Sequence, residues 1–468
     1  MKKNNFKTAI LCFLFFVVFS VLQINLSFLS RTRNVTPSSD NPGTKRLKQK
    51  NVFKQNSLPP PHPPPTPPPS SQATQINCDR SHRSYDLCKI NGPTVLDPTI
   101  ATLYLAGPTS STPNIVEKIR PYPRKWESFI MRRIREVTLT SGPQSPSCEV
   151  QHNMPALVFS AGGYTGNVFH DFNDGLIPLF ITVNSVFSDD QDFILVISKS
   201  RDWWVSKYAD LLQAFSKHPI INLDNDTSTH CFTSATIGLI SHGFVTINPK
   251  LLPNSKTFTH FHALLDKAYS TDHSEKNHHR GSTFNLPRRK PRLILASRSG
   301  NIGRVLLNQN EVKNLAENIG FDVIIFEPNS STPLRKAYAL IKSSHAMIGV
   351  HGAALTHSLF LRPGSVFLQV VPLGNEWVAE YCFGNLGRAM GLEYIEYRIG
   401  VEESSLIDKY DKNNLLIKDP IASQGKNWSG DVMSIYLKEQ NVRLDLIRFR
   451  EYLSRAYEKA KKFMDKEG

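Results

Sequence analysis

The chain lacks the short motifs that mark several common kinds of binding site. Of its 468 residues only six are cysteines, and no two of them form a Cys-x-x-Cys pair, which argues against a structural zinc site. There is no Gly-x-Gly-x-x-Gly fingerprint and no Walker lysine motif, which argues against a dinucleotide cofactor or ATP. Zinc-finger spacing and the aromatic signature of RNA-binding domains are also missing, so we expect no nucleic-acid partner.

Positive charge, by contrast, is in excess, with a net charge of +15, and much of it lies near the N-terminus. Between residues 31 and 54 the basic side chains are opposed only by Asp40. They follow Thr8–Ser30, an apolar segment of roughly the 20 residues that a helix needs to cross a bilayer. We expect an uncleaved membrane anchor at 8–30 after a cytoplasmic tail at 1–7; a cleaved signal peptide is the alternative. The basic stretch is then a solvated neck beside the membrane, or an arm that binds a polyanion.

Asn-x-Ser/Thr sequons favour a lumenal location for the rest of the chain. They are at Asn34, Asn225, Asn329 and Asn427.

The cysteines outside the anchor suggest two disulfides. Cys78 and Cys88 stand ten residues apart in a polar stretch and are candidates to close a small loop. Cys148 and Cys231 are the second candidate pair, which leaves Cys382 as a free, buried thiol.

Beyond the anchor we expect a stem and two domains. The stem, 31–75, contains a proline-rich run that should form an extended polyproline helix and act as a spacer. The N-terminal domain, 76–285, contains two buried strands, Ala156–Ser160 and Phe193–Ser198, which are typical of a parallel sheet. The segment Ser270–Pro291 has no hydrophobic pattern and reads as an exposed interdomain linker.

The C-terminal domain, 286–445, alternates strands and helices, which predicts a doubly wound parallel sheet. We expect strands at Arg292–Ser297, Phe321–Pro328, Ala346–Val350 and Ser365–Pro372, and helices at Asn310–Gly320, Ser331–Ser344 and from Gly352. Pro333 should lie in the first turn of its helix, where its missing N–H costs nothing. A long amphipathic helix should end the chain at 446–468. The fold class is therefore α/β, with two Rossmann-like domains that face a cleft.

Two strand-to-helix junctions of the C-terminal domain suit an anion. Arg298 and Arg304 follow the first strand, and guanidinium groups form paired charged hydrogen bonds with phosphate. The loop "GVHGAALTH" (349–357) follows the third strand, where small residues and the start of a helix would let the backbone approach a pyrophosphate. His351 and Thr356 can add hydrogen bonds. A nucleoside diphosphate that carries a leaving group fits these junctions, although a tight turn with small packing residues is the alternative for the loop.

The stretch "VFSAGGYTGNVFHDFNDGLIPLF" (158–180) offers acid/base chemistry on the other side of the cleft. His170 and Asp174 stand four residues apart and share a face if a helix begins there. The alternative is helix capping by Asn167 and Asp171, with His170 as a structural residue. Two pairs of acidic residues, at 190–192 and 224–226, have the spacing of metal ligands but lie in unsuitable places, so we expect metal-independent chemistry.

At these residues the chain resembles glycosyltransferase family 61, in particular its plant branch, from about Cys78 to the C-terminus. Four stretches carry the resemblance: "CDRSHRSYDLC", "PALVFSAGGYTGNVFHDFNDGLIPLFIT", "SRSGNIGRVLLNQNE" and "IGVHGAALTHSLFLRPGSVFLQVVP". It implies a GT-B fold, an inverting reaction with a UDP-sugar donor, and a type II protein of the Golgi membrane. Plant members include xylan arabinosyl- and xylosyltransferases and the N-glycan core β-1,2-xylosyltransferase.

The family's motifs can be placed on this chain residue by residue. A His-x-Phe-x-Asp pattern falls on His170, Phe172 and Asp174, with Asp174 as the preferred general base and His170 as its rival. The donor-binding residues are expected to be Arg298, Arg304, Asn308, Glu327, His351, Gly352, Ala353 and Thr356. Ala354 stands where many plant members have glycine, a mild departure.

We therefore expect a transferase that moves xylose or arabinofuranose from a UDP-sugar onto xylan or a related cell-wall polysaccharide. The alternatives are transfer to the N-glycan core, or a non-catalytic scaffold in a Golgi enzyme complex.

Overall fold

The computed structural model describes residues 75–106, 115–142, 145–270, 290–425 and 430–467. The predicted anchor, almost all of the stem, most of the interdomain linker and the sequons at Asn34 and Asn427 lie outside these ranges. Among the helices within them, none has both the length and the apolar character needed to cross a bilayer. We call residues 75–270 the N-terminal lobe and 290–467 the C-terminal lobe; both belong to one compact unit.

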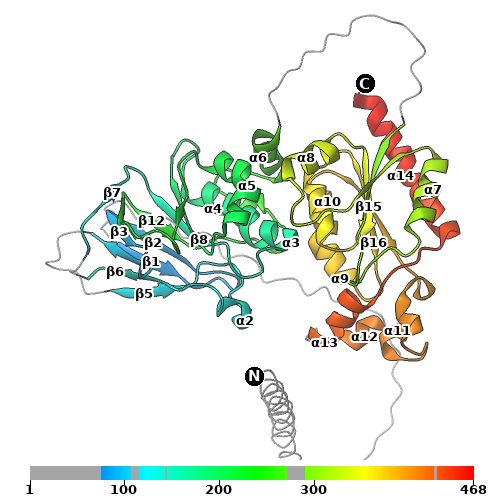
Figure 1. Ribbon diagram of the computed structural model, residues 1–468, viewed down its shortest axis with the longest axis horizontal. Coiled ribbons are helices and arrows are strands. Elements are labelled where there is room, and N and C mark those ends of the chain that lie inside the picture. The colour runs from blue at the N-terminus through cyan, green and yellow to red at the C-terminus, as the bar shows by residue number, and fades with distance from the viewer. Residues whose placement is uncertain (1–74, 107–114, 143–144, 271–289, 426–429, 468) are drawn as a thin grey trace, which may run out of the picture. The chain divides into compact units, whose positions relative to one another are not determined.

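The N-terminal lobe contains two six-stranded sheets (Figure 1). The first sheet has the order β1 (Gln75–Asp79), β2 (Leu87–Asn91), β12 (Ala235–Ile237), β8 (Ala156–Ser160), β9 (Ile194–Ser198) and β10 (Ile221–Asn222). The second has the order β5 (Val116–Ile119), β6 (Val137–Thr140), β4 (Thr102–Leu105), β3 (Thr94–Asp97), β11 (His230–Phe232) and β7 (Val150–Gln151).

Strand β8, at the centre of the first sheet, is apolar in nearly every position because both of its faces are buried. Ala156 and Val158 face a core that is shared with the second sheet. Leu157 and Phe159 face the opposite core, which includes residues of α4 (Ile177–Val186), α5 (Asp202–Phe215) and α6 (Phe258–Tyr269). Because alternate side chains of a strand point to opposite faces, a strand between two cores must be apolar throughout.

The expectation of a simple Rossmann-like N-terminal domain is therefore incomplete. In the first sheet only β12, β8, β9 and β10 pair in parallel, while β1 and β2 extend the sheet antiparallel. The second sheet is not evident in the sequence because its strands have two to four residues, too few for a two-residue period to stand out.

The C-terminal lobe contains a five-stranded parallel sheet. Its order is β14 (Asp322–Phe326), β13 (Arg292–Ala296), β15 (Ala346–Val350), β16 (Val366–Val371) and β17 (Glu393–Arg398). From β13 the chain adds β14 on one side, and β15, β16 and β17 then follow on the other side. The strand order therefore reverses between β13 and β15, and doubly wound folds bind ligands at such a point. The predicted parallel sheet is confirmed in this lobe.

Helices connect these strands at the predicted places, with two differences. Helix α7 (Gln309–Ile319) ends at Gly320 as expected. Helix α8 (Leu334–Lys342) begins one residue after Pro333, so this proline is the N-cap and does not lie in the first turn. After β15 the chain forms the 3-10 helix η3 (Ala353–Phe360) in place of an α-helix.

The amphipathic C-terminal helix is also present. Helix α14 (Leu446–Glu467) contacts α7, β16 and β17, all within its own lobe. Its apolar face packs against the core of the C-terminal sheet through Phe449, Leu453, Ala456 and Ala460.

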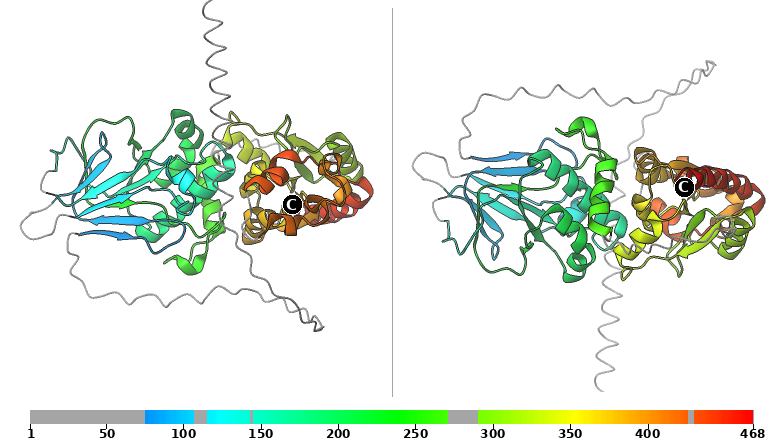
Figure 2. Two further views of the ribbon diagram at one scale, coloured as in Figure 1. Left: turned by 90° about the horizontal axis from the view of Figure 1, so that it is seen from below. Right: turned by 90° about the horizontal axis from the view of Figure 1, so that it is seen from above.

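The two lobes meet through a shared hydrophobic cluster. Helix α3 (Val168–His170) contacts η3, and α6 contacts α8 and η3. The ring centroids of Phe169 and Phe383 are 5.7 Å apart, and those of Tyr269 and Tyr338 are 5.6 Å apart. Figure 2 shows the helices of this junction between the sheets of the two lobes. The junction places the loop after β8 opposite the loops after β13 and β15.

Candidate active site

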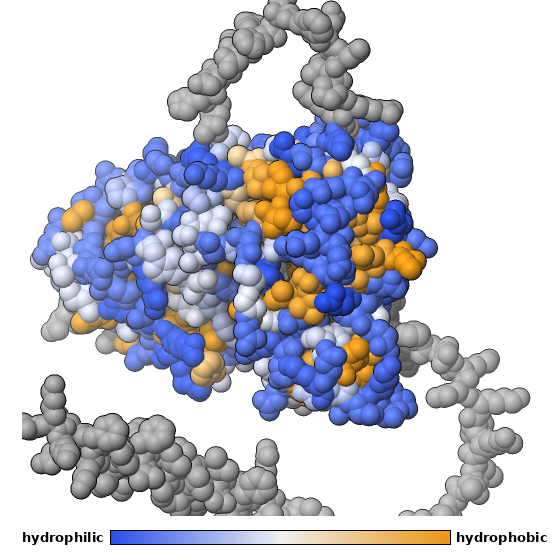
Figure 3. Space-filling view, turned by 45° about the vertical axis from the view of Figure 1, so that its right-hand side comes forward, coloured by the Kyte–Doolittle hydropathy of each residue, from blue (hydrophilic) through white to orange (hydrophobic). Residues whose placement is uncertain are grey.

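A cavity of about 720 Å³ lies at the junction and is lined by both lobes. From the C-terminal lobe come Ser297 and Arg298 after β13, residues 328–330 after β14 and residues 351–354 after β15. The cavity therefore opens at the carboxyl ends of three neighbouring parallel strands, where α/β sheets bind ligands. The surface in Figure 3 is mostly hydrophilic with separate apolar patches, and no single patch identifies a binding site. We therefore locate the site by the cavity.

His170 reaches the cavity from the N-terminal lobe. It ends α3, whose N-cap Asn167 accepts a hydrogen bond from the amide of Phe169. A π-helical turn, Asp171–Leu176, follows and continues into α4. This turn brings Nδ1 of His170 within 2.8 Å of Oδ2 of Asp174. Single π-helical turns within helices are often found at functional sites.

Asp174 is enclosed by hydrogen-bond donors and does not line the cavity. Its side chain is 2% exposed. Arg124 Nε donates to Oδ1 at 2.8 Å, and the Tyr122 hydroxyl donates to Oδ2 at 2.9 Å. Burial acts to raise the pKa of Asp174, but the hydrogen bond with His170 and the charge of Arg124 outweigh it and lower the pKa. Asp174 is therefore a carboxylate with no open side toward a ligand.

This geometry gives the two candidate bases different access to the cavity. The Asp174 carboxylate can only accept hydrogen bonds. Nδ1 of His170 therefore carries a hydrogen and donates a hydrogen bond to Asp174. In the neutral form of this tautomer the lone pair of Nε2 is available, and Nε2 makes no hydrogen bond to the described part of the chain. The His170 side chain is 20% exposed and lines the cavity, so it is the member of the pair that can accept a proton from a ligand.

Arg124 is a site residue that the sequence did not reveal. It is 4% exposed and lines the cavity, and besides Asp174 it bonds Glu127 at 2.7 Å. Its Nη2 lies 3.3 Å from Nδ1 of His170. Tyr164 completes the group, because its ring stacks on His170 and its hydroxyl donates to Glu127 at 2.7 Å. Arg124 lies 50 residues before Asp174, and only the folded chain brings the two together.

The neighbouring acid, Asp171, points away from the cavity wall and is held by hydrogen bonds within the lobe. Asp171 is buried, and it accepts hydrogen bonds from the Tyr208 hydroxyl at 2.7 Å and from the amide of Gly166 at 3.1 Å. Burial raises its pKa. Asp171 therefore fixes the glycine loop, while His170 faces the cavity.

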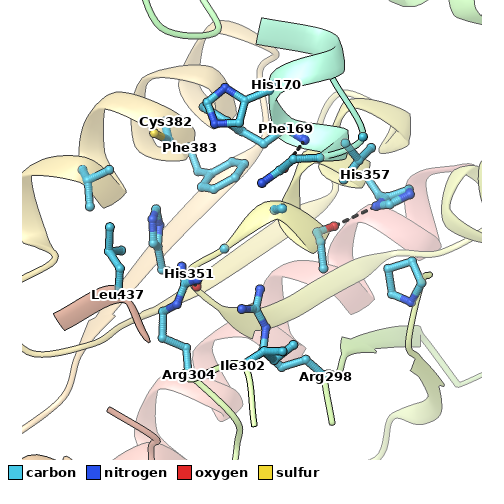
Figure 4. A pocket seen from close by; sticks show the side chains of 18 of the residues that line it. Phe169, His170, Arg298, Ile302, Arg304, His351, His357, Cys382, Phe383 and Leu437 are labelled. Atoms are coloured by element: carbon cyan, nitrogen blue, oxygen red, sulfur yellow. Dashed lines mark hydrogen bonds between the residues drawn. The ribbon is translucent and has the colours of Figure 1, made fainter. Parts of the chain in front are cut away.

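Two arginines form the opposite wall of the cavity (Figure 4). No described carboxylate pairs with Arg298 or Arg304, and the Nε atom of Arg304 is buried without a hydrogen-bond partner. Burial lowers the pKa of Arg298. Burial and the charge of Arg298 lower the pKa of Arg304 to about 10, so both side chains are cationic at neutral pH. Two half-buried cations that have no counter-ion among the described residues form a site for an anion.

The backbone holds these arginines in place. An added Cβ at Gly352 would lie 2.0 Å from Nη2 of Arg298, so only glycine lets this guanidinium lie across the loop. Arg304 has a φ of +56°, and its amide donates to the carbonyl of Gln440 at 2.5 Å. Its Nη1 donates to the carbonyl of His351 at 3.3 Å.

His351 lies beside the arginines as a neutral donor. Its pKa is lowered to about 3 by burial and by the charges of Arg304 and Arg298. The Tyr394 hydroxyl donates to Oε1 of Gln369, and Nε2 of Gln369 donates to Nδ1 of His351, both at 2.8 Å. The remaining proton of His351 is therefore on Nε2.

The other predicted donor-binding residues divide into two groups. Gly352 and Ala353 line the cavity, as predicted for the loop after β15. Thr356 is buried in η3 outside the cavity wall. Glu327 is exposed beside the wall and accepts a hydrogen bond from the Ser299 hydroxyl.

Asn308 also lies outside the wall and serves the fold. It is buried, and its amide exchanges two hydrogen bonds with the backbone of Leu444, at 2.9 and 3.0 Å. It therefore joins the start of α7 to the segment that leads into α14.

The remaining predicted groups are placed as follows. Disulfides join Cys78 to Cys88 and Cys148 to Cys231, the two candidate pairs. Cys382 is free and lines the cavity, and burial raises the pKa of its thiol to about 12, so it is not a thiolate at neutral pH.

Of the two described sequons, Asn225 lies in an exposed turn and Asn329 lies on the rim of the cavity. No group of three or more His, Cys, Asp or Glu side chains within the described ranges is arranged to hold a metal ion. Among the acids at 190–192 and 224–226, Asp192 forms an ion pair with Lys217 and Asp224 with Arg135, and Asp226 lies 3.2 Å from Nε2 of His230.

Comparison with known proteins shows to which family the chain belongs. The sequence profile described as Glycosyltransferase 61 matches residues 168–368, which include His170, Arg298, Arg304 and His351. A xylan glycosyltransferase of Arabidopsis thaliana is 38% identical over 405 residues, 84% of this chain and 81% of the relative. An alpha-1,3-arabinosyltransferase of Oryza sativa subsp. japonica is 36% identical over 82% of this chain and 65% of its own length. A beta-1,2-xylosyltransferase of the same rice is 32% identical over 94% of this chain and 93% of its own length. Because this similarity extends over most of its length, the chain belongs to glycosyltransferase family 61 and is a glycosyltransferase.

Proposed function

We propose that this protein transfers a pentose, xylose or arabinofuranose, from a UDP-sugar to xylan or a related cell-wall polysaccharide. The names of the similar plant proteins support the sugar class and the acceptor. The observation that carries the mechanism is one cavity with His170, backed by the buried Asp174, on one wall and two unpaired arginines on the other. We also infer that the two lobes form a GT-B fold, with the acceptor on the N-terminal lobe and the nucleotide on the C-terminal lobe.

The donor diphosphate binds the C-terminal wall. Arg298 and Arg304 offer several N–H donors to its oxygens, and the neutral His351 adds one from Nε2. As the bond from the anomeric carbon to the diphosphate oxygen breaks, its electron pair stays on the leaving UDP. The two guanidinium groups stabilise that charge.

His170 is the general base. The acceptor hydroxyl gives its proton to Nε2 of His170 while its oxygen forms a bond to the anomeric carbon from the side opposite the leaving group. This single displacement inverts the anomeric configuration. Asp174 accepts the hydrogen bond from Nδ1 and so holds the imidazole in the tautomer that leaves Nε2 free, while Arg124 fixes the position of the Asp174 carboxylate. Asp174 then stabilises the imidazolium that forms.

The arginines supply the charge that a metal ion provides in other transferases, so we propose that the reaction is metal-independent. Activity that EDTA leaves unchanged supports this proposal, and activity that EDTA abolishes and manganese restores contradicts it.

We further propose a type II protein of the Golgi membrane, with the anchor at 8–30 and the two lobes in the lumen. The two disulfides support an oxidising compartment. Fluorescent tagging combined with protease protection of the lobes tests this location.

A donor and acceptor screen tests the function directly. The full-length chain is incubated with UDP-xylose, UDP-arabinofuranose, UDP-arabinopyranose or UDP-N-acetylglucosamine, with xylo-oligosaccharides or an N-glycan as acceptor. We expect UDP release together with a pentose added to the xylo-oligosaccharide. Transfer only to the N-glycan, or UDP binding without any transfer, contradicts the proposal.

A further inference from the structure

A row of aromatic side chains crosses the junction beside His170. It consists of Trp126 before α2 (Ser128–Met131), Phe244 after β12, Trp377 in α9 (Glu376–Ala379) and Tyr381 in the π-helical turn Glu380–Gly384. We call these four residues the aromatic row. Two of them come from each lobe.

The row is continuous and joins the site through Arg124. The Arg124 guanidinium lies 5.3 Å from the ring of Trp126 and 5.2 Å from that of Phe244. The centroids of Phe244 and Trp377 are 6.5 Å apart, and those of Trp377 and Tyr381 are 4.9 Å apart. Phe244, Trp377 and Arg124 line the cavity, while Trp126 and Tyr381 extend the row beyond its wall.

Three of the four rings, those of Trp126, Trp377 and Tyr381, are exposed to solvent. Trp126 is 43% exposed and Tyr381 is 46% exposed. Rings that served only the fold would gain stability from fuller burial, by about 25 cal/mol for each Å² removed from water. Exposed aromatic rings that continue a cavity are typical of a binding surface.

We propose that the aromatic row is the acceptor subsite and binds a chain of pyranose rings such as the xylan backbone. The inference rests on the proposed function and names the surface that this function uses. A pyranose ring carries C–H groups on its faces and hydroxyls at its edge, so its faces pack on aromatic rings while the hydroxyls stay in water. Xylopyranose has no hydroxymethyl group, which leaves both faces flat.

The position of the row favours the acceptor over the donor. A general base must lie within hydrogen-bond reach of the acceptor hydroxyl, so the acceptor has to pass beside His170. The row meets the site at Arg124, whose Nη2 lies 3.3 Å from Nδ1 of His170. The diphosphate wall around Arg298 and Arg304 lies on the other side of the cavity (Figure 4).

The test changes the two ends of the row, which lie outside the cavity wall. The full-length variants Trp126→Ala and Tyr381→Ala are compared with Trp126→Phe, which keeps a ring. The matched control is Phe129→Ala, because Phe129 is a 58% exposed aromatic residue whose ring lies under Arg133 and is not part of the row. The measurements are the KM and kcat for xylobiose through xylohexaose, and the affinity for UDP.

We expect each alanine variant to raise the KM for xylohexaose by roughly threefold to tenfold, with a smaller effect on xylobiose. UDP affinity should stay at the wild-type value, which also shows that the variants fold, and Phe129→Ala should behave as wild type. If the wild-type enzyme transfers to xylo-oligosaccharides but both alanine variants keep an unchanged KM for every chain length, the aromatic row is not the acceptor subsite. A loss of the same size for all chain lengths also overturns the proposed subsite. A wild-type enzyme that binds UDP but uses no xylo-oligosaccharide overturns the proposed acceptor itself, and with it the xylan assignment of the row.

Discussion

Nδ1 of His170 lies 2.8 Å from Oδ2 of Asp174, and Arg124 occupies the other oxygen of that carboxylate at the same distance. The pair thus has one buried member that is fixed by other residues and one member that is open to the cavity. This arrangement assigns different functions to the two residues, and mutation can separate them.

Replacing His170 with alanine should remove the base and leave the donor site intact. General acid–base groups contribute roughly 10²- to 10⁴-fold to the rate. We therefore expect kcat to fall within that range while the affinity for UDP, measured by calorimetry, stays unchanged. A His170→Ala enzyme with full turnover would place the base elsewhere.

Replacing Asp174 with asparagine should reduce stability as well as activity, because the buried Arg124 loses its counter-ion. Loss of one partner of a buried pair costs about 3–5 kcal/mol. We expect urea unfolding at pH 7 to show a loss of about that size, less what the amide oxygen recovers.

The loss of stability in Asp174→Asn should depend on pH, because it reflects the charge of the Asp174 carboxylate. The pKa of Asp174 is lowered in the folded protein, so its contribution is present above the unfolded value of about 4 and disappears as the pH falls through the folded value. The difference between wild type and Asp174→Asn should therefore shrink below about pH 4. A difference that stays constant down to pH 2 would mean that the carboxylate charge is not what stabilises the fold.

Replacing Arg304 with alanine should weaken UDP without weakening uridine, because only the diphosphate meets the guanidinium. A charge-assisted hydrogen bond contributes about 1.5–3 kcal/mol, so the Kd for UDP should rise roughly 10- to 100-fold. Arg132→Ala is the control, because Arg132 is exposed and lies outside the cavity. Equal losses for UDP and uridine would argue for a general structural effect.

Replacing Gly352 with alanine should act through Arg298. The added methyl group would occupy the position of the guanidinium, and a φ of +155° already disfavours a side chain there. We expect UDP affinity to fall as far as in Arg298→Ala, and the double variant to be no worse than either single one. Additive losses in the double variant would show that Gly352 and Arg298 act separately.

Much of the C-terminal lobe could be predicted from the sequence because its elements are local. Strands such as Ala346–Val350 are apolar throughout and are separated by amphipathic helices, so both periods are visible. The loops at the ends of these strands could be located for the same reason, and with them Arg298, Arg304 and His351.

The N-terminal side of the site depends on contacts between distant residues and could be predicted only in part. Tyr122 and Arg124 have no pattern of their own, and their function appears only where the chain returns at Asp174. Our proposal of His170 as the base depends on burial, and the spacing of His170 and Asp174 contains no information about which of the two side chains is covered. Asn308 was misplaced because a buried amide that clamps two backbone groups looks, in sequence, like a ligand-binding polar residue.

The unpaired arginines also have a consequence for turnover. UDP carries more negative charge than the same diphosphate esterified to a sugar, so a wall of two uncompensated cations holds the spent nucleotide more tightly than the fresh donor. For the proposed UDP-sugar donor we therefore predict that release of UDP, and not formation of the glycosidic bond, is the slow step, and that accumulated UDP inhibits the enzyme in competition with its donor. An enzyme built in this way works at full rate only where another activity, a nucleoside diphosphatase, removes UDP from its surroundings.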